Sequence, residues 1–368
     1  MPHRSTVTIR RVAAFLFRAP IARPVRTSFG VMTDRPMLYL RVEDHEGATG
    51  LGEVWCNFPS VGAEHRKHLA ETLVAPVIVE IGEITPGKVY ATLMDRLHVL
   101  GIQSGEWGPL RQVSAGLDAA CHDLAARRSG LPLYRYLNDQ AADRIRCYAS
   151  GIGPESPDTA AAEAMKQGHL AFKVKVGFGV EADDRTLANT RAAIGPGQCL
   201  MADANQAWDI DRALALAPSL SAYDLTWLEE PLRADRPTDE WKRLAAVAPM
   251  PLAGGENLAR PSDFDAAMTH AYLSYLQPDV AKWGGVSGCF AVARQAEGKG
   301  LVYCPHFLGG AVGLMTSAHL LAAVGGSGFL EVDVNPNDLR DAQLCGVFAV
   351  QDGKMRLGDR PGIGIDLD

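Results

Sequence analysis

Residues 171–205 read AFKVKVGFGVEADDRTLANTRAAIGPGQCLMADAN, and their pattern is the strongest indication of the fold. It begins with a short apolar run at 171–176, continues through a helical pattern, and ends in a second apolar run at 199–205. Two short strands joined by a helix are typical of a parallel sheet, because parallel neighbours need a long crossover connection. We therefore expect the same strand and helix unit to recur along the chain.

The unit does recur on both sides of this stretch. Its further apolar runs are RCYAS (146–150), LTWLEEP (225–231), PLAGGEN (251–257), YLQPDV (275–280), LVYCPHF (301–307) and GFLEVD (328–333). Each run has a polar tip, and helical stretches separate the runs. Alternating strands and helices in this number close into an eight-stranded barrel of the (β/α)₈ type.

The first part of the chain has a different pattern. Its beginning, MPHRSTVTIRRVAAFLFRAP, is interpreted as a first strand, and the alternation from 36 to 54 around the DHEG turn predicts a hairpin. Helical spacing follows at 64–79, 86–100 and 110–128. Together these segments predict a separate α+β unit. The tail has hairpin-like pieces and ends PGIGIDLD, and we expect it to pack against that unit.

Composition excludes several classes of function. With 368 residues, 47% hydrophobic and 21% charged, the chain has the composition of an ordinary globular protein. A net charge of −7 argues against a nucleic-acid partner, and no segment approaches the length of a membrane helix. The seven cysteines are scattered without close pairs, which favours reduced thiols and a cytoplasmic location.

Two lysines stand two residues apart on one expected strand. Because side chains in a strand alternate, Lys173 and Lys175 point the same way, into the barrel. A lysine in such a place either has a chemical role or extends its amino group to solvent or to a carboxylate. Taken alone, the pair leaves both interpretations open.

Three acids end three successive strands. Asp203, Glu229 and Glu256 follow one another at spacings of 26 and 27 residues. Carboxylates that converge at one barrel mouth would repel one another, so convergence indicates a cation, and oxygen ligands favour Mg²⁺ or Mn²⁺. The alternative for any one acid is a solvated loop position. Glu230 has the opposite parity and is assigned a structural salt bridge, whereas Asn205 shares the inward parity of Asp203.

The last three strands carry further polar residues. Asp279 and His306 end neighbouring strands, so a barrel would bring them side by side. An Asp that holds one imidazole nitrogen makes the other a better base, although a lone buried His is more often structural. On the last strand, Glu331 has the inward parity of Phe329.

Taken together, these segments resemble the enolase superfamily, and within it the mandelate racemase subgroup. The matching motifs are KVK (173–175), DAN (203–205), WLEEP (227–231), GGEN (254–257), PDVAKWGG (278–285), PH (305–306) and LE (330–331). The resemblance covers essentially the whole length. It implies a (β/α)₇β modified TIM barrel at 136–334, an α+β capping domain at 1–135 that acts as a lid, and a C-terminal segment at 335–368 that completes the cap.

The resemblance also implies roles for the site residues. Asp203, Glu229 and Glu256 would hold Mg²⁺, which stabilises the enediolate formed when a proton leaves the carbon next to a carboxylate. Lys175 would be the base on one face of that carbon. Lys173 would lower the pKa of Lys175 and touch the carboxylate. His306, oriented by Asp279, would act on the other face, Glu331 would donate a hydrogen bond to the carboxylate if protonated, and Lys282 would have a supporting role.

The substrate is less clearly indicated. The loops expected to close over it lie at 22–33 and 55–62 and mix aromatic, thiol, amide and cationic groups. Phe29 and Trp55 are candidate substrate contacts, together with Lys173, Asn205 and Glu331. Phe29, Trp55 and Phe58 could equally be packing residues of the lid.

By analogy with relatives that carry this Lys and His–Asp set, we expect dehydration of a sugar acid, an aldonate or aldarate, to a 2-keto-3-deoxy acid. The alternative is a racemase, an epimerase or a lactone cycloisomerase. Schiff-base chemistry at Lys175 or Lys173 and a barrel that only binds a carboxylate are also considered, and the three acids and the full catalytic set disfavour them. The expected partners are a small carboxylate substrate and further copies of this chain.

Overall fold

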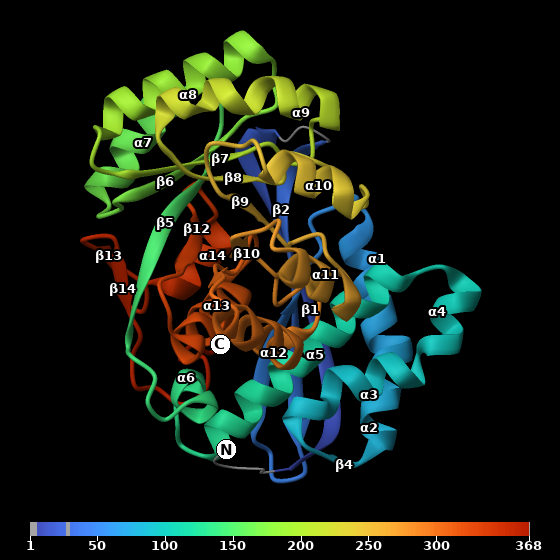
Figure 1. Cartoon of the computed structure of the whole chain (residues 1–368). Helices are drawn as coiled ribbons and strands as arrows, with labels where there is room; N and C mark the ends of the chain where they lie inside the picture. The colour runs from blue at the N-terminus through green and yellow to red at the C-terminus, as the bar shows by residue number, and fades with distance from the viewer. Residues whose placement is uncertain (1–5, 27–29, 368) are drawn as a thin grey trace.

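The computed structural model of the chain describes residues 6–26 and 30–367. Figure 1 shows two parts, a barrel of alternating strands and helices and an α+β cap beside it. Their strands form two separate sheets, of which one has the order β3-β2-β1-β4 and the other contains the barrel. The expected division into an α+β unit and a barrel is therefore confirmed.

The cap is a long antiparallel sheet covered by helices. Its elements are β1 (Val7–Arg26), β2 (Val31–Asp44), β3 (Thr49–Val54), β4 (Glu83–Ile84), α1 (Gly62–Leu69), α2 (Ala75–Ile81), α3 (Val89–Arg96), α4 (His98–Ser104) and α5 (Trp107–Arg128). The predicted hairpin is present, and Asp44 Oδ1 closes its turn by accepting the backbone N–H groups of Glu46 and Ala48 at 2.9 Å. Helix α5 lies against β3, where a Cβ atom on Gly52 would stand 1.9 Å from the carbonyl oxygen of Gly116. Only glycine permits this approach.

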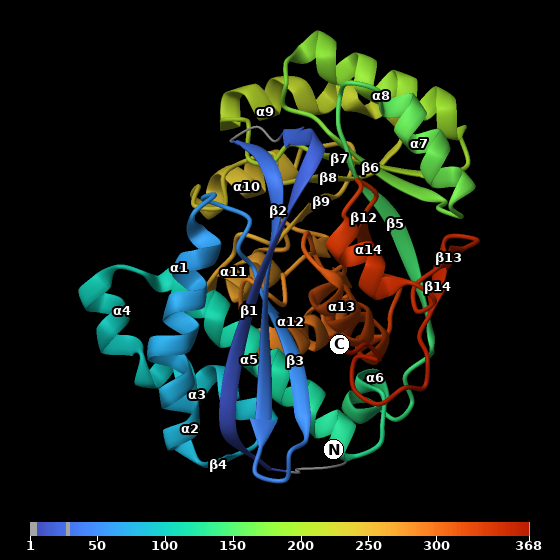
Figure 2. The ribbon, with the colours of Figure 1, turned by 180° about the vertical axis from the view of Figure 1, so that it is seen from behind.

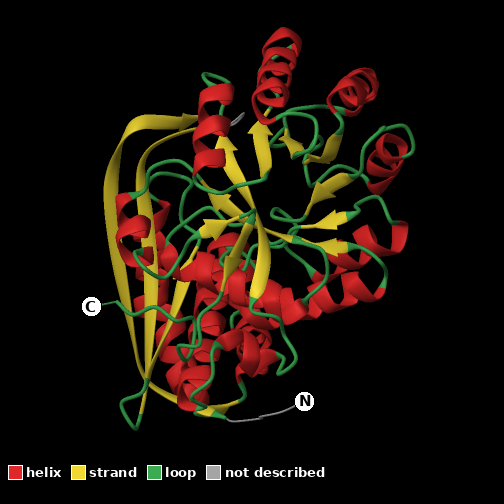
Figure 3. Cartoon of the chain, turned by 90° about the vertical axis from the view of Figure 1, so that its left-hand side faces the viewer, coloured by secondary structure: helices red, strands yellow, loops and turns green. Residues whose placement is uncertain are grey.

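The barrel strands run in the order expected from the repeated unit. They are β5 (Arg144–Ile152), β6 (Ala171–Lys175), β7 (Cys199–Asp203), β8 (Leu225–Glu229), β9 (Leu252–Gly254), β10 (Tyr275–Leu276), β11 (Val302–Tyr303) and β12 (Phe329–Asp333). The connecting helices are α7 (Pro157–Lys166), α8 (Val180–Ile194), α9 (Ile210–Leu216), α10 (Thr238–Ala245), α11 (Pro261–His270), α12 (Gly285–Gly298) and α13 (Ala311–Val324). Figure 3 looks into the barrel, with its strands at the centre and helices outside.

Consecutive strands from β5 to β11 pair in parallel, and β12 pairs in parallel with β5. Between β11 and β12 the described residues form no backbone ladder. There the backbone N–H of Phe329 donates to Sγ of Cys304 at 3.3 Å. This arrangement is the expected (β/α)₇β barrel, with one seam joined by a side chain instead of a backbone ladder.

The tail contacts both parts of the molecule. It contains α14 (Asp338–Leu344), β13 (Val350–Gln351) and β14 (Lys354–Arg356), and β14 pairs antiparallel with the start of β5. Further on, the backbone N–H of Ile363 donates to Asp123 of the cap at 2.7 Å. Figure 2 shows α14 and α13 next to the cap strands β1 and β3. The tail thus extends the barrel sheet as well as meeting the cap.

An apolar layer fills the barrel below its mouth. Its members are Tyr148, Ala171, Met201, Trp227, Ala253, Cys304 and Phe329, each from a different strand or strand end. The rings of Tyr148 and Trp227 meet edge to face at a centroid distance of 5.4 Å. Because strand side chains repeat with a period of two, the residues two positions further along form the next inward layer. That layer contains the polar residues that the sequence singles out.

No helix in the described part of the chain is long and apolar enough to cross a membrane. The seven cysteines are all free, and most are buried.

Candidate active site

The inward layer at the barrel mouth is a cluster of charged groups. Two positions beyond the apolar layer stand Ser150, Lys173, Asp203, Glu229, His306 and Glu331. Strand pairing sets Lys175 opposite Asp203 and Asp203 opposite Glu229. Parallel strands therefore bring the expected residues to one edge, where contacts join them into a single network.

Lys173 is the buried centre of this network. Its Nζ atom lies 2.5 Å from Oε1 of Glu229 and 2.8 Å from Oε1 of Glu331, and 5.3 Å from the centre of the Tyr148 ring. Burial opposes its charge, but Glu229 and Glu331 outweigh burial and raise the pKa of Lys173 well above its usual value. Lys173 is therefore an ammonium group held by two carboxylates, and of the two interpretations left open, carboxylate pairing describes its contacts.

Lys175 lies nearer to solvent, with 17% of its side chain exposed. Its Nζ atom lies 2.6 Å from Oδ2 of Asp203. Burial and the charge of Lys173 both lower its pKa, but Asp203 outweighs them, so the pKa of Lys175 is raised overall. Lys173 does lower the pKa of Lys175, as expected. The expectation of a lowered pKa overall is wrong, because Asp203, at 2.6 Å, has the larger effect.

His306 stands between two acids. Its Nδ1 atom lies 2.7 Å from Oδ2 of Asp279, and its Nε2 atom lies 2.7 Å from Oε2 of Glu256. The other oxygen of Asp279 accepts the backbone N–H of Ala281 at 2.8 Å. Burial opposes protonation, but Glu256 and Glu331 raise the pKa of His306 well above its usual value. The imidazole is thus oriented by Asp279, in the arrangement that a general acid or base requires.

Glu331 accepts hydrogen bonds in this arrangement. Ser150 Oγ donates to one of its oxygens at 2.5 Å, and the backbone N–H of Phe307 donates to the other at 3.1 Å. Burial raises its pKa, but Lys173 and His306 outweigh burial and lower the pKa of Glu331 to about 2. The expected role of Glu331 as a hydrogen-bond donor requires a protonated carboxyl. That requirement is not met here, because Lys173 and His306 favour the carboxylate form of Glu331.

Glu229 is held from several sides. Gln277 Nε2 donates to its Oε2 atom at 2.6 Å, and Trp227 Nε1 donates to the same oxygen at 3.0 Å. Burial raises the pKa of Glu229 to about 7 although Lys173 opposes that change. Asp203 is held in a similar way, because the backbone N–H and the side-chain amide of Asn205 both donate to it, at 2.8 and 3.1 Å.

Asp203, Glu229 and Glu256 have the donor chemistry of a hard divalent cation site. All three offer carboxylate oxygens, they come from successive strands, and hydrogen bonds from Asn205 and Gln277 orient two of them. Among residues 6–26 and 30–367, however, no three His, Cys, Asp or Glu side chains stand close enough together to hold a metal ion as arranged. Lys175, Lys173 and His306 occupy their oxygens instead.

Glu230 is not part of an ion pair with any described residue. Its two oxygens accept the amide of Asn257 at 3.0 and 2.8 Å, and burial together with Glu256 raises the pKa of Glu230 well above its usual value. The predicted structural salt bridge is therefore wrong. Lys282, the nearest candidate cation, instead donates to Oδ1 of Asn257 at 2.8 Å and lies 3.8 Å from Glu256.

The cap reaches the barrel mouth through the segment that follows β3. The backbone N–H of Trp55 donates to the carbonyl of Ala281 at 3.2 Å, and its ring lies 4.9 Å from Nζ of Lys282. Asn57 donates to the carbonyl of Leu308 at 2.7 Å. Trp55 thus lies beside the site and contacts Lys282. Phe29, the other aromatic candidate, lies outside the described residues.

Several residues of the site are absent from the sequence predictions. Ser150 and Gln277 hold Glu331 and Glu229, and their parity relative to Tyr148 and Asp279 is a signal that could have identified both. Asn57 carries no such signal, because it comes from the cap and reaches the barrel only through the fold.

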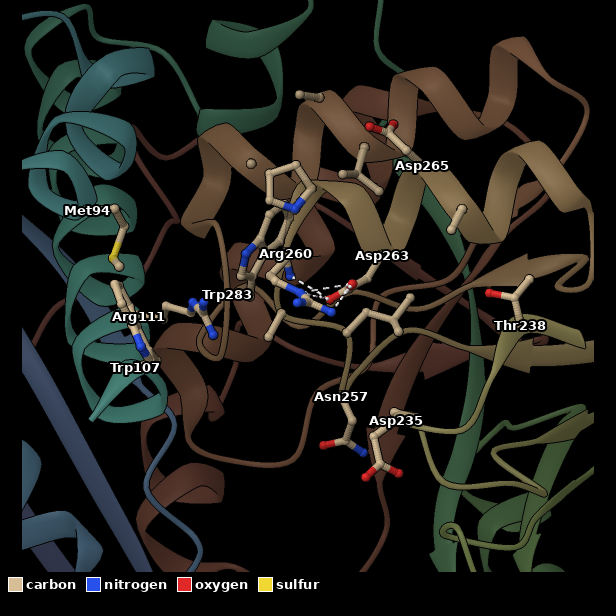
Figure 4. A pocket seen from close by; sticks show the side chains of 18 of the residues that line it. Met94, Trp107, Arg111, Asp235, Thr238, Asn257, Arg260, Asp263, Asp265 and Trp283 are labelled. Atoms are coloured by element: carbon tan, nitrogen blue, oxygen red, sulfur yellow. Dashed lines mark hydrogen bonds and ion pairs between the residues drawn. The ribbon is translucent and has the colours of Figure 1, made fainter. Parts of the chain in front are cut away.

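A large cavity of about 1410 Å³ lies beside this cluster, between the cap helices and the barrel helices. Figure 4 shows Trp107 and Arg111 on its cap side and Asn257, Arg260 and Trp283 on its barrel side. The cluster of lysines, acids and His306 does not line it. Asn257 is the link between the two, because its amide donates to Glu230 and Glu256.

Comparisons with known proteins find relatives along nearly the whole chain. The family "Mandelate racemase / muconate lactonizing enzyme, N-terminal domain" matches residues 10–137, and the family "Enolase C-terminal domain-like" matches residues 158–368. A 3,6-anhydro-alpha-L-galactonate cycloisomerase from Streptomyces coelicolor is 30% identical, over 98% of this chain and 97% of that protein.

Two solved structures extend the comparison. A mandelate racemase/muconate lactonizing enzyme from Bordetella bronchiseptica has a TM-score of 0.92 and 48% identity, covering 99% of this chain and 98% of that one. An L-talarate dehydratase from Polaromonas, in complex with Mg and L-glucarate, has a TM-score of 0.82 and 27% identity, covering 98% and 95% of the two chains.

Proposed function

Because this chain belongs to the mandelate racemase and muconate lactonizing enzyme family of the enolase superfamily, we propose that it removes the proton on the carbon next to a substrate carboxylate. The observation that best supports this is the placement of two bases in one network. Lys175 stands on β6, and His306 follows β11 across the barrel mouth. Two bases on different sides of one site can act on opposite faces of one carbon.

We propose that Asp203, Glu229 and Glu256 hold Mg²⁺, with Mn²⁺ as the alternative. The L-talarate dehydratase structure in complex with Mg supports this assignment. The three carboxylates of this chain support it as well, because Mg²⁺ prefers oxygen ligands. The ion would supply the positive charge that stabilises an enediolate. Its ligands are the acids that Lys175 and His306 now contact, so both bases would be freed toward the substrate when those oxygens are used for coordination.

The remaining residues have supporting roles in this proposal. Lys175 takes the proton on one face, and His306, oriented by Asp279, gives or takes a proton on the other. Lys173 and Glu331 form the wall that receives the substrate carboxylate, and Asn205 keeps Asp203 in place. Trp55 and the rest of the 55–62 segment form the lid, which their contacts with Ala281 and Leu308 support.

We propose dehydration of a sugar acid, an aldonate or an aldarate, to a 2-keto-3-deoxy acid. In that reaction Lys175 removes the α-proton and His306 protonates the departing β-hydroxyl group. The relative that binds L-glucarate supports this choice. The second candidate is cycloisomerisation of a lactone or an anhydro sugar acid, which the Streptomyces relative favours through its similarity over nearly the full length of both chains.

The test is a screen of mono- and diacid sugars, their lactones and their anhydro derivatives with Mg²⁺ in deuterated water. Formation of a 2-keto acid identifies dehydration, and ring opening or closure without loss of water identifies cycloisomerisation. Incorporation of deuterium next to the carboxylate without net reaction indicates racemase or epimerase activity. A complete absence of exchange with every acid would contradict the proposed proton abstraction. A homo-oligomer and a cytoplasmic location stay predictions.

A further inference from the structure

We propose that Glu53, a buried carboxylate of the cap, is a positioning residue that holds His306 in place for its side of the reaction. The inference rests on the proposed function, because it concerns one of the two proposed bases. Glu53 belongs to β3, far from His306 in the sequence, and none of the motifs in the sequence includes it. Both hydrogen bonds of its carboxylate to described residues are with the segment that follows His306.

The carboxylate of Glu53 binds the beginning of α13. Its Oε1 atom accepts the backbone N–H of Gly310 at 2.6 Å, and its Oε2 atom accepts the backbone N–H of Gly313 at 2.8 Å. The residue is only 4% exposed. These two N–H groups have no partner inside the helix. The carboxylate of Glu53, which belongs to the capping domain, accepts them in place of a side chain from the helix's own N-terminus. Because both bonds cross between the domains, the cap fixes the position of this helix end.

The glycines at this helix start transmit that position to the residue beside His306. A Cβ atom on Gly313 would stand 2.2 Å from the ring of Phe307, and one on Gly309 would stand 2.7 Å from the same ring and 2.6 Å from Oε1 of Glu53. The Phe307 ring is therefore packed directly on the segment that Glu53 holds. We expect a displacement of that segment to displace Phe307 as well.

Phe307 is also fixed from the barrel side. Its backbone N–H donates to Oε2 of Glu331 at 3.1 Å, and Glu331 is bound to Lys173. Phe307 is thus held by Glu331 through its backbone N–H and by packing of its ring against the segment that Glu53 binds. The imidazole depends on this backbone placement to keep Nδ1 within 2.7 Å of Asp279.

A buried acid at this position has an energetic cost. Burial raises the pKa of Glu53 to about 7, the two glycine N–H groups oppose that change, and the charge of Asp279 adds to it. The other titratable groups that Glu53 faces are the hydroxyl of Tyr39 and the thiol of Cys56. Burying a carboxylate without a cationic partner costs free energy of folding. Such a residue is expected where function requires a defined geometry.

The experiment compares Glu53→Gln with Asp123→Asn. Asp123 is a suitable control because it too is a buried cap acid that accepts two backbone N–H groups, from Leu51 and Ile363, and it does not contact the 305–313 segment. The melting temperature of each variant is measured first. In separate samples of folded protein, exchange of the α-proton is measured for both stereoisomers of an acid that the enzyme accepts.

In Glu53→Gln, the amide can accept only one of the two N–H groups and repels the other. We expect exchange on the His306 face to fall by about 10²-fold, the usual effect of a misplaced catalytic group, while exchange on the Lys175 face changes less than about threefold. Asp123→Asn should lower the melting temperature without a difference between the faces. An equal loss on both faces, or no loss on either, would overturn the proposal.

A second measurement does not depend on turnover. The ring signals of isotopically labelled His306 are compared by NMR between the unaltered protein and Glu53→Gln. A shifted or broadened His306 signal, with an unchanged signal for the exposed His45, supports the positioning role even if no substrate is found. Identical His306 signals in the two proteins would contradict it. Absence of exchange in the unaltered protein would count against the proposed function alone.

Discussion

The Nε2 atom of His306 lies 2.7 Å from Oε2 of Glu256, so one proposed base is bound to one proposed metal ligand. Lys175 has the same relationship with Asp203, at 2.6 Å. Cation binding by the acids and the freedom of the two bases are therefore linked. A group that neutralises the acids must compete with the cationic side chains, and it releases them in doing so.

The first prediction concerns the metal. Replacing Glu256 by Gln removes one anionic ligand, and we expect the affinity for Mg²⁺ to fall by at least about tenfold in isothermal titration calorimetry. Glu230→Gln is the matched control, because Glu230 is an adjacent buried carboxyl bonded to Asn257. It should bind Mg²⁺ within about threefold of the unaltered protein. Equal affinities in both variants would remove Glu256 from the ligand set.

The second prediction separates the two faces of the substrate carbon. In His306→Asn, turnover should be lost while Lys175 still exchanges the α-proton of one stereoisomer with solvent, because the second base survives. Lys175→Ala should retain exchange of the other stereoisomer only. Proton NMR in deuterated water measures both. If each variant loses exchange with every substrate, the assignment of two independent bases is wrong.

The third prediction assigns Asp279 to His306 and not to the metal. Asp279→Asn can still hold the ring but no longer stabilises its cationic form. We expect reactions that need His306 to slow by roughly 10²–10⁴-fold, while exchange at the Lys175 face continues. Mg²⁺ affinity, measured by calorimetry, should change little. A large loss of Mg²⁺ binding would place Asp279 among the metal ligands.

The fourth prediction concerns stability against acid. Burial lowers the pKa of His319 to about 3, and its Nδ1 atom accepts the backbone N–H of Tyr134 at 3.2 Å. The folded protein therefore binds fewer protons here than the unfolded chain, whose His titrates near 6.5. The stability from this group is complete above pH 6.5 and is lost as the pH falls toward 3.

Urea unfolding at pH 7.5 and at pH 5 measures this effect. His319→Gln keeps an acceptor for Tyr134 but cannot be protonated, so its free energy of unfolding should fall by about 2 kcal/mol less over this range than that of the unaltered protein. Some acid sensitivity remains through His169, whose pKa burial lowers to about 4. The exposed His45→Gln serves as control. The same loss in His319→Gln and in the unaltered protein would contradict the assignment.

Local periodicity was sufficient to predict the barrel and the side on which its polar residues lie. The period of two placed Lys173, Asp203, Glu229 and Glu331 in one inward layer, because alternation along a strand is set by the backbone alone. The hairpin at 36–54 followed in the same way from alternation and a turn sequence. The family motifs then added the expected roles, since their order reflects one shared architecture.

Which groups pair with one another depends on the three-dimensional arrangement of the strands and is not visible in the sequence. Glu230 binds Asn257 instead of a cation, and Asp203 raises the pKa of Lys175 against the effect of Lys173, because these outcomes depend on distances of 2.6 to 3.0 Å between separate strands. The link from Glu53 to Gly310 joins residues 257 positions apart and has no local pattern. Electrostatic interactions and hydrogen bonds change steeply over such distances, whereas sequence spacing specifies only the strand and the face.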